Sequence, residues 1–214
     1  MRSEDTNISK IIPEFVKVLK EFAEKGLITR EMIVNCKKAN EGNLHNKLQG
    51  VFIKAVNNCG YLAIPEEKIQ LEKPILRRKK YQKVYKPDVS FYKNDERIGI
   101  CEIISMETVA QLFPTEELEK ICTKAKVYWK TSITSATKLL TVPQQIKNSK
   151  IFIIVVMPKI AKKTPAWKDF KAVAGNSNHI FEKFKPALDK LCEKLKENCS
   201  VYPLVITEDE PVKF

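Results

Sequence analysis

The chain has 214 residues, 43% of them hydrophobic, so it can bury a full core and its length favours one large domain over two small ones. Its formal net charge of +12 and its pI near 9.3 favour a polyanionic partner such as nucleic acid or an anionic membrane. No apolar run is long enough to span a bilayer and the N-terminus lacks a signal-peptide pattern, so we expect a cytoplasmic protein without a membrane partner. The six cysteines follow no metal-ligand spacing, which favours reduced thiols.

Apolar spacing predicts three helices in the first part of the chain. The first covers residues 11–26 and ends at Gly26. A second, shorter helix is expected over residues 30–39, with Thr29 as its N-cap, and a third over residues 43–58. The buried stripe predicted for the third helix is Leu44, Leu48, Val51, Phe52, Ala55 and Val56.

The rest of the chain alternates strands and helices. The predicted elements are strands at 68–76, 84–92 and 98–105, a helix at 114–129, a helical or irregular piece to 147, a buried strand at 151–157, a helix at 179–198 and a strand at 201–207. This order predicts an α/β fold with a mixed central β-sheet flanked by helices. We expect an N-terminal helical extension over residues 1–40 and an α/β domain over residues 41–214, in a single compact molecule.

Two of the strands carry one acid each. Period-two alternation on both sides of the polar stretch 93–97 predicts a β-hairpin. On matching faces of its strands lie Asp88 with Ser90 and Tyr92, and Glu102 with Ile98, Ile100 and Ile104. Two carboxylates at the end of a hairpin can hold Mg²⁺ together with water and a substrate phosphate. The alternative is that Asp88 is a turn residue after Pro87 and that Glu102 pairs with a nearby cation.

These acids and the element order resemble the PD-(D/E)xK nuclease superfamily, over roughly residues 41–157. Pro87-Asp88 is similar to the first half of the family motif, and Glu102 is similar to the acid of the second half. The resemblance implies a restriction-endonuclease-like fold and a metal-dependent DNA endonuclease, in which Asp88 and Glu102 bind Mg²⁺ or Mn²⁺. It also implies a third metal-site acid at the start of the helix that precedes these strands, and Glu41 stands there. His45, one helical turn further on, is a candidate for lining the same site.

The chain departs from the motif two residues after Glu102, where Ile104 replaces the family's lysine. That lysine would position or deprotonate the attacking water and neutralise charge on the phosphate, and Ile104 can do neither. Lys124, at a position where many members carry a glutamine on the next helix, is our candidate catalytic substitute. Three alternatives stay open: the metal alone activates water, the protein binds nucleic acid without cutting it on a degenerate nuclease fold, or it is a protein-interaction module whose charge serves solubility.

A basic stretch without acids leads directly into Pro87-Asp88. Its members are Arg77, Arg78, Lys79, Lys80, Tyr81, Lys83, Tyr85 and Lys86. The cations would neutralise phosphates and the tyrosines could stack on bases, which predicts duplex or branched DNA as the partner. A symmetric homodimer would suit such a substrate. The alternative is a charged hairpin that keeps an edge strand soluble.

Overall fold

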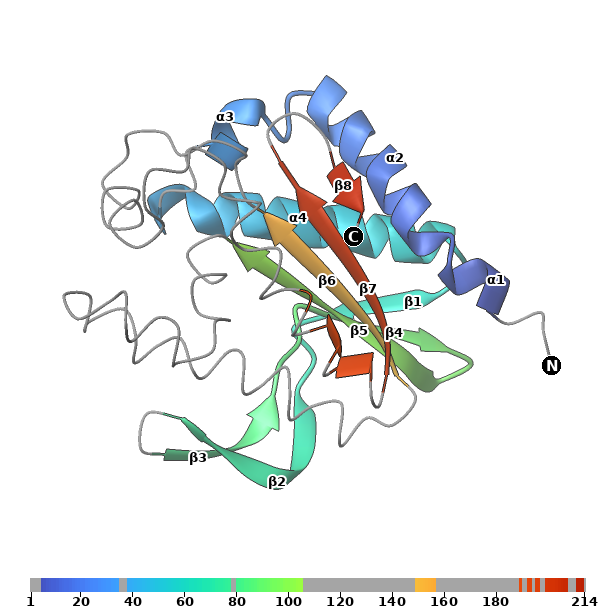
Figure 1. The fold of residues 1–214 in the computed structure, drawn as a ribbon, viewed down its shortest axis with the longest axis vertical. Helices are drawn as coiled ribbons and strands as arrows, with labels where there is room; N and C mark the ends of the chain where they lie inside the picture. The colour runs from blue at the N-terminus through green and yellow to red at the C-terminus, as the bar shows by residue number, and fades with distance from the viewer. Residues whose placement is uncertain are drawn as a thin grey trace.

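The computed structural model describes residues 5–34, 38–77, 80–105, 149–156, 199–207 and 211–213, with a few positions between 189 and 196. In this part of the chain, helices flank a mixed six-stranded sheet, and two further strands form a separate arm (Figure 1). The order in the sheet is β1 (Leu62–Pro65), β4 (Val89–Lys93), β5 (Glu96–Ser105), β6 (Lys150–Val156), β7 (Ser200–Ile206) and β8 (Pro211–Lys213). Strands β5, β6 and β7 run parallel, and the pairs toward both edges are antiparallel. The predicted fold class is confirmed.

Four helices precede the sheet. They are α1 (Asp5–Ile8), α2 (Ile11–Glu24), α3 (Arg30–Val34) and α4 (Lys38–Asn58). The predicted end of the first long helix is confirmed by Gly26, which has a φ of +66°, a conformation that glycine adopts without a steric penalty. The predicted cap of α3 is also confirmed, because Met32 N–H donates to Thr29 Oγ1 at 3.3 Å. Helix α4 begins five residues before the predicted start at residue 43.

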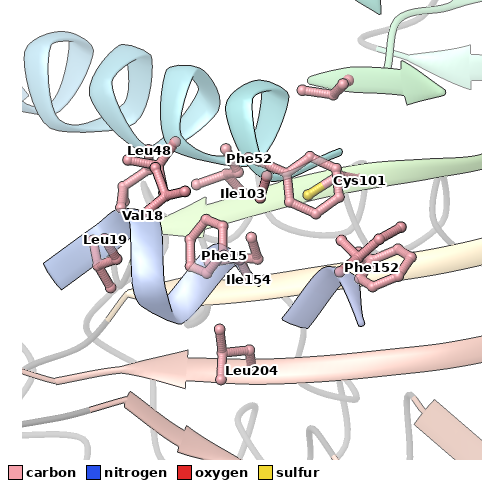
Figure 2. Packing of buried hydrophobic residues seen from close by; sticks show 14 of the residues in the cluster. Phe15, Val18, Leu19, Leu48, Phe52, Cys101, Ile103, Phe152, Ile154 and Leu204 are labelled. Carbon is pink, nitrogen blue, oxygen red and sulfur yellow. The ribbon is translucent and has the colours of Figure 1, made fainter. Parts of the chain in front are cut away.

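Helices α2 and α4 pack together on one face of the sheet and share a single core with it (Figure 2). The predicted stripe of α4 is buried at all six positions. The Phe52 ring lies at its centre, with centroids 6.1 Å from Phe15 of α2, 6.3 Å from Phe91 of β4 and 5.4 Å from Phe152 of β6. The expected boundary at residue 40 falls inside α4, and the division into extension and domain stays a prediction.

The β4–β5 hairpin is confirmed, with a tighter turn than the expected loop at 93–97. Asn94 and Asp95 have φ angles of +49° and +63°, as in the two-residue turns that match the twist of paired strands. A bulge between Phe91 and Tyr92 shifts the register on β5. Because of this shift Ile98 packs against the helix-side core, so the prediction that it shares a face with Ile100 is wrong.

Gly99 lies beside this bulge, where β5 is closely enclosed. A Cβ atom at this position would come within 2.2 Å of Phe91 Cζ and 2.4 Å of the Lys150 carbonyl oxygen. The two contacts belong to the strands on either side of β5, so neither can move without disturbing the sheet. Only glycine fits here without displacing its neighbours.

The single strand predicted over residues 84–92 is wrong, because the chain forms two strands there. Strand β3 (Lys80–Tyr85) pairs with β2 (Ile69–Arg77) in the arm, and β4 begins in the main sheet at Val89. Pro87 separates them, since proline lacks an N–H for a strand ladder and restricts the residue before it. The β2–β3 arm projects from the body of the molecule in Figure 1.

The predicted strands 151–157 and 201–207 are confirmed as β6 and β7. Of the predicted helix 179–198, the few described residues between 189 and 196 are helical, while the predicted helix 114–129 lies outside the described residues. The four described cysteines, Cys59, Cys101, Cys192 and Cys199, are free thiols. Burial raises the pKa of Cys192 to about 11. Within the described ranges, no helix has the length and apolar character to cross a membrane.

Candidate functional site

The two hairpin acids lie together at the end of β4. Strand β4 begins one residue after Asp88, and Val89 pairs with Cys101, so continuing this register by one residue sets Asp88 beside Glu102. A direct contact fixes the arrangement, because the Ile103 backbone N–H donates to Asp88 Oδ2 at 2.6 Å. The predicted juxtaposition of the two acids is therefore present.

Helix α4 supplies two polar side chains to the same place, four residues apart on one helical face. His45 Nε2 lies 3.2 Å from Asp88 Oδ1, and Gln49 Nε2 donates to the Asp88 carbonyl oxygen at 2.6 Å. That carbonyl also accepts the Glu66 N–H at 3.1 Å. The side chain and backbone of Asp88 are thus both held, while 19% of its side-chain surface stays exposed.

His45 is set in a negative environment. The hydrogen bond to Asp88 raises the pKa of His45 above its ordinary value, although burial acts in the opposite direction. The charges of Asp88, Glu102 and Glu66 raise this pKa further. The surroundings of His45 therefore favour its protonated, positively charged form.

Glu102 is held from a different direction, by the arm. The Tyr85 hydroxyl donates to Glu102 Oε1, and the Tyr85 ring is only 2% exposed. This burial corrects the expected role of Tyr85, because a ring enclosed in this way has no free face on which a base can stack.

The donor chemistry of the pair fits a magnesium ion. Asp88 and Glu102 offer hard carboxylate oxygens. The Ile103 N–H and His45 orient Asp88, and the Tyr85 hydroxyl orients Glu102. Mg²⁺ is commonly held by one or two carboxylates, with water and phosphate completing its shell. No cluster of three or more His, Cys, Asp or Glu side chains among the described residues could hold a metal by itself.

For two of the other predicted site residues, the structure does not describe the side chain. Glu41 falls within the first turn of α4, one turn before His45, and its side chain lies outside the described residues. Lys124 also lies outside them. Ile104 occupies β5 opposite Val155 of β6. The roles assigned to Glu41 and Lys124 stay predictions.

The predicted basic stretch runs along the arm and its connection to the sheet. Arg77 ends β2, and Lys80, Tyr81 and Lys83 lie in β3, with only their backbone described. Arg78 and Lys79, at the turn of the arm, lie outside the described residues, and Lys86 is exposed just before Pro87. Nucleic-acid binding by this stretch stays a prediction.

Three residues of the site were not assigned to it from the sequence. The sequence could have indicated Gln49, because it follows His45 by one helical turn and so lies on the same face of α4. Tyr85 and Glu66 had none, because their contacts arise from the way the arm joins the sheet. Glu66 adopts a φ of +48°, which is uncommon for a residue with a side chain.

A second carboxylate cluster lies elsewhere on β4 and β5 and provides an internal comparison. The Tyr92 hydroxyl donates to Glu67 Oε1 at 2.5 Å, and Arg97 lies 3.3 Å from the same oxygen. Burial opposes ionisation of Glu67, but the hydrogen bonds with Tyr92 and Ser90, followed by the charge of Arg97, outweigh it and lower the pKa of this carboxyl. Here an arginine neutralises the acid, whereas Tyr85 donates to Glu102 as a neutral group.

Comparisons with known proteins give little beyond this geometry. No protein-family model matches the chain, and no curated protein is significantly similar to it. Among solved structures it is similar to "The structure of Pyrococcus Furiosus SfsA in complex with Ca2+", with 14% sequence identity and a TM-score of 0.35. The match covers 78% of this chain and 62% of that one, less than two thirds of its length. A TM-score at this level is too low to assign a family.

Proposed function

We propose that the protein is a metal-dependent DNA endonuclease of the PD-(D/E)xK type, with Asp88 and Glu102 as the ligands of Mg²⁺ or Mn²⁺. The observation that supports this most is the bond from the Ile103 N–H to Asp88 Oδ2, which holds Asp88 beside the part of β5 that carries Glu102. Two acids held side by side repel each other, and a divalent cation relieves that repulsion. The basic stretch that enters the site supports a polyanionic substrate.

In this proposal the chain's own groups hold the acids in place. The Ile103 N–H and Gln49 fix Asp88, and the Tyr85 hydroxyl orients Glu102. The bound ion supplies charge neutralisation at the phosphate and activation of a water molecule. Lys124 is the proposed source of the cation that Ile104 does not provide.

The test is cleavage of plasmid, single-stranded and branched DNA with Mg²⁺ or Mn²⁺. Asp88→Asn and Glu102→Gln keep side-chain size and remove the ligand charge, so each is expected to lower the cleavage rate by at least about 100-fold. Asp95→Asn and Glu96→Gln are matched controls, because both acids are exposed in the turn of the same hairpin. They are expected to cleave as the natural chain does. Equal cleavage by all five proteins contradicts the proposal.

One observation favours a second candidate, a nucleic-acid-binding protein that does not cut. Ile104 stands where the motif carries its lysine, so the fold can persist without the catalytic cation. This candidate predicts salt-sensitive DNA binding with no hydrolysis under any metal. Absence of DNA affinity at physiological salt contradicts both candidates and favours a protein-interaction module.

A further inference from the structure

The arm and the acid pair are joined through one buried side chain. Tyr85 is the last residue of β3 and pairs with Ile69 at the base of the arm. Both residues are buried, at 2% and 6% exposure, and the Tyr85 hydroxyl reaches Glu102 Oε1 on β5. The packed base of the arm therefore fixes where this hydroxyl lies.

A tyrosine hydroxyl has the right chemistry to orient an acid that must stay charged. It donates a hydrogen bond without carrying a positive charge, so it limits the rotation of Glu102 and leaves the carboxylate negative. An arginine or lysine in its place would neutralise the acid, as Arg97 does for Glu67 in the second cluster. The two clusters therefore contain the same tyrosine-to-glutamate bond in different electrostatic settings.

We propose that Tyr85 is a positioning residue that holds the Glu102 carboxylate in its metal-binding orientation, so that the base of the arm sets the geometry of the acid. The inference rests on the proposed function, because it takes Glu102 as a ligand of a divalent ion. Tyr85 is not itself a ligand in this proposal. Its effect on the metal passes entirely through the bond to Glu102.

The experiment measures Mn²⁺ affinity of the full chain by titration calorimetry, without DNA. Tyr85→Phe keeps the buried ring and removes only the hydroxyl, and it is expected to weaken Mn²⁺ binding about 10–100-fold, as removal of a hydrogen-bond partner from a metal ligand does. Tyr92→Phe is the matched control, because it removes the same kind of bond from Glu67. It is expected to leave the Mn²⁺ dissociation constant within about twofold of the natural value. Melting temperatures show whether each variant is folded.

A second pair of proteins keeps the test decisive if Tyr85→Phe also perturbs the fold. Glu102→Asp draws the carboxylate back from Tyr85 by one methylene group and weakens the bond between them, so adding Tyr85→Phe to it is expected to cause little further decrease in Mn²⁺ affinity. A further decrease of about tenfold or more overturns the inference, because the effect then bypasses Glu102. Equal Mn²⁺ affinity of Tyr85→Phe and the natural chain also overturns it, while the proposed function stands. If the natural chain shows no Mn²⁺ binding that Asp88→Asn removes, the proposed function and the inference both fail.

Discussion

Gly99 is closely enclosed between the two strands that pair with β5. It lies between the Phe91 ring on one neighbouring strand and the Lys150 carbonyl oxygen on the other. A methyl group at this point meets backbone as well as side chain, so a rotamer change cannot relieve the contact. Strand separation is set by the hydrogen-bond ladder, and widening it would weaken bonds on both sides of β5.

Gly99→Ala is therefore expected to destabilise the protein by about 3 kcal/mol, near the upper end for overpacking a core. Chemical denaturation followed by circular dichroism measures this change. Gly50→Ala in α4 is the control, because its added methyl group would meet no atom within 4 Å. In a helix that change is expected to stabilise by about 0.5–1 kcal/mol. Equal stability of Gly99→Ala and the natural chain contradicts the packing argument.

Which site residues the sequence could reveal depends on how local their contacts are. Asp88 and Glu102 were predictable together, because a hairpin brings its own strands into pairing and alternation then fixes the faces. Tyr85 was predicted only as a member of the basic stretch that could stack on bases. Its burial depends on how the arm packs against β5, and no pattern within the arm encodes that contact.

At the scale of elements, the β2–β3 arm is the part of the molecule that differs most from expectation. Its first strand was predicted, but the second was merged with β4 across Pro87. The residues on both sides of that proline have strand-like patterns, so pattern alone could not show that they enter different sheets. Tyr85, at the junction of the arm with the sheet, is the residue of the arm that contacts Glu102 in the described structure.

The arm is expected to carry much of the salt-dependent affinity for DNA. Replacing Arg77, Lys80 and Lys83 with glutamine is predicted to lower the slope of log affinity against log salt by about 1 for each phosphate that the protein no longer neutralises. Fluorescence anisotropy with a labelled duplex at several salt concentrations measures the slope. Lys17, Lys20 and Lys25, exposed on or just after α2, provide a control triple with the same change in net charge. If both triples change the slope equally, overall charge and not the arm accounts for binding.

At the scale of the whole molecule, the first long helix belongs to the same core as the sheet. Ile11, Phe15, Val18 and Leu19 of α2 are all buried, and they pack with α4 and the strands in one cluster. Burying a side chain of this size contributes about 1.5–3 kcal/mol. Four of them together are comparable with the entire stability of a typical domain, about 5–15 kcal/mol.

A fragment of residues 41–214 is therefore expected not to fold by itself, because it lacks α2 and begins inside α4. The full chain should unfold cooperatively on heating, and the fragment should show no such transition by calorimetry. Two variants of the full chain separate the effect of the core from the effect of chain length. Phe15→Ala removes a buried ring of α2 and should lower the melting temperature by several degrees. Lys20→Ala, on the exposed face of α2, should leave the melting temperature unchanged. A cooperative transition in the fragment would show that residues 1–40 are a dispensable extension.

The overall architecture was largely predictable, because its long buried elements carry strong patterns. The apolar run at Ile151 and the stripe of α4 each identify their element without help from the rest of the chain. Strands β1 and β8 were missed for the opposite reason. Each has only three or four residues, and Leu62 of β1 is exposed, so their strand character comes from pairing with a neighbour.

The enclosure of Gly99 has a consequence for the descent of this protein. The three atoms nearest to a Cβ at Gly99 belong to Phe91 and Lys150 and not to the acid pair, so the sheet and the proposed site place separate demands on the sequence. A lineage that keeps a glycine here but replaces Asp88 or Glu102 has retained the ancestral sheet and abandoned the proposed site. Variation at Asp88 and Glu102 among relatives that keep Gly99 is therefore expected to separate loss of the proposed site from loss of the sheet.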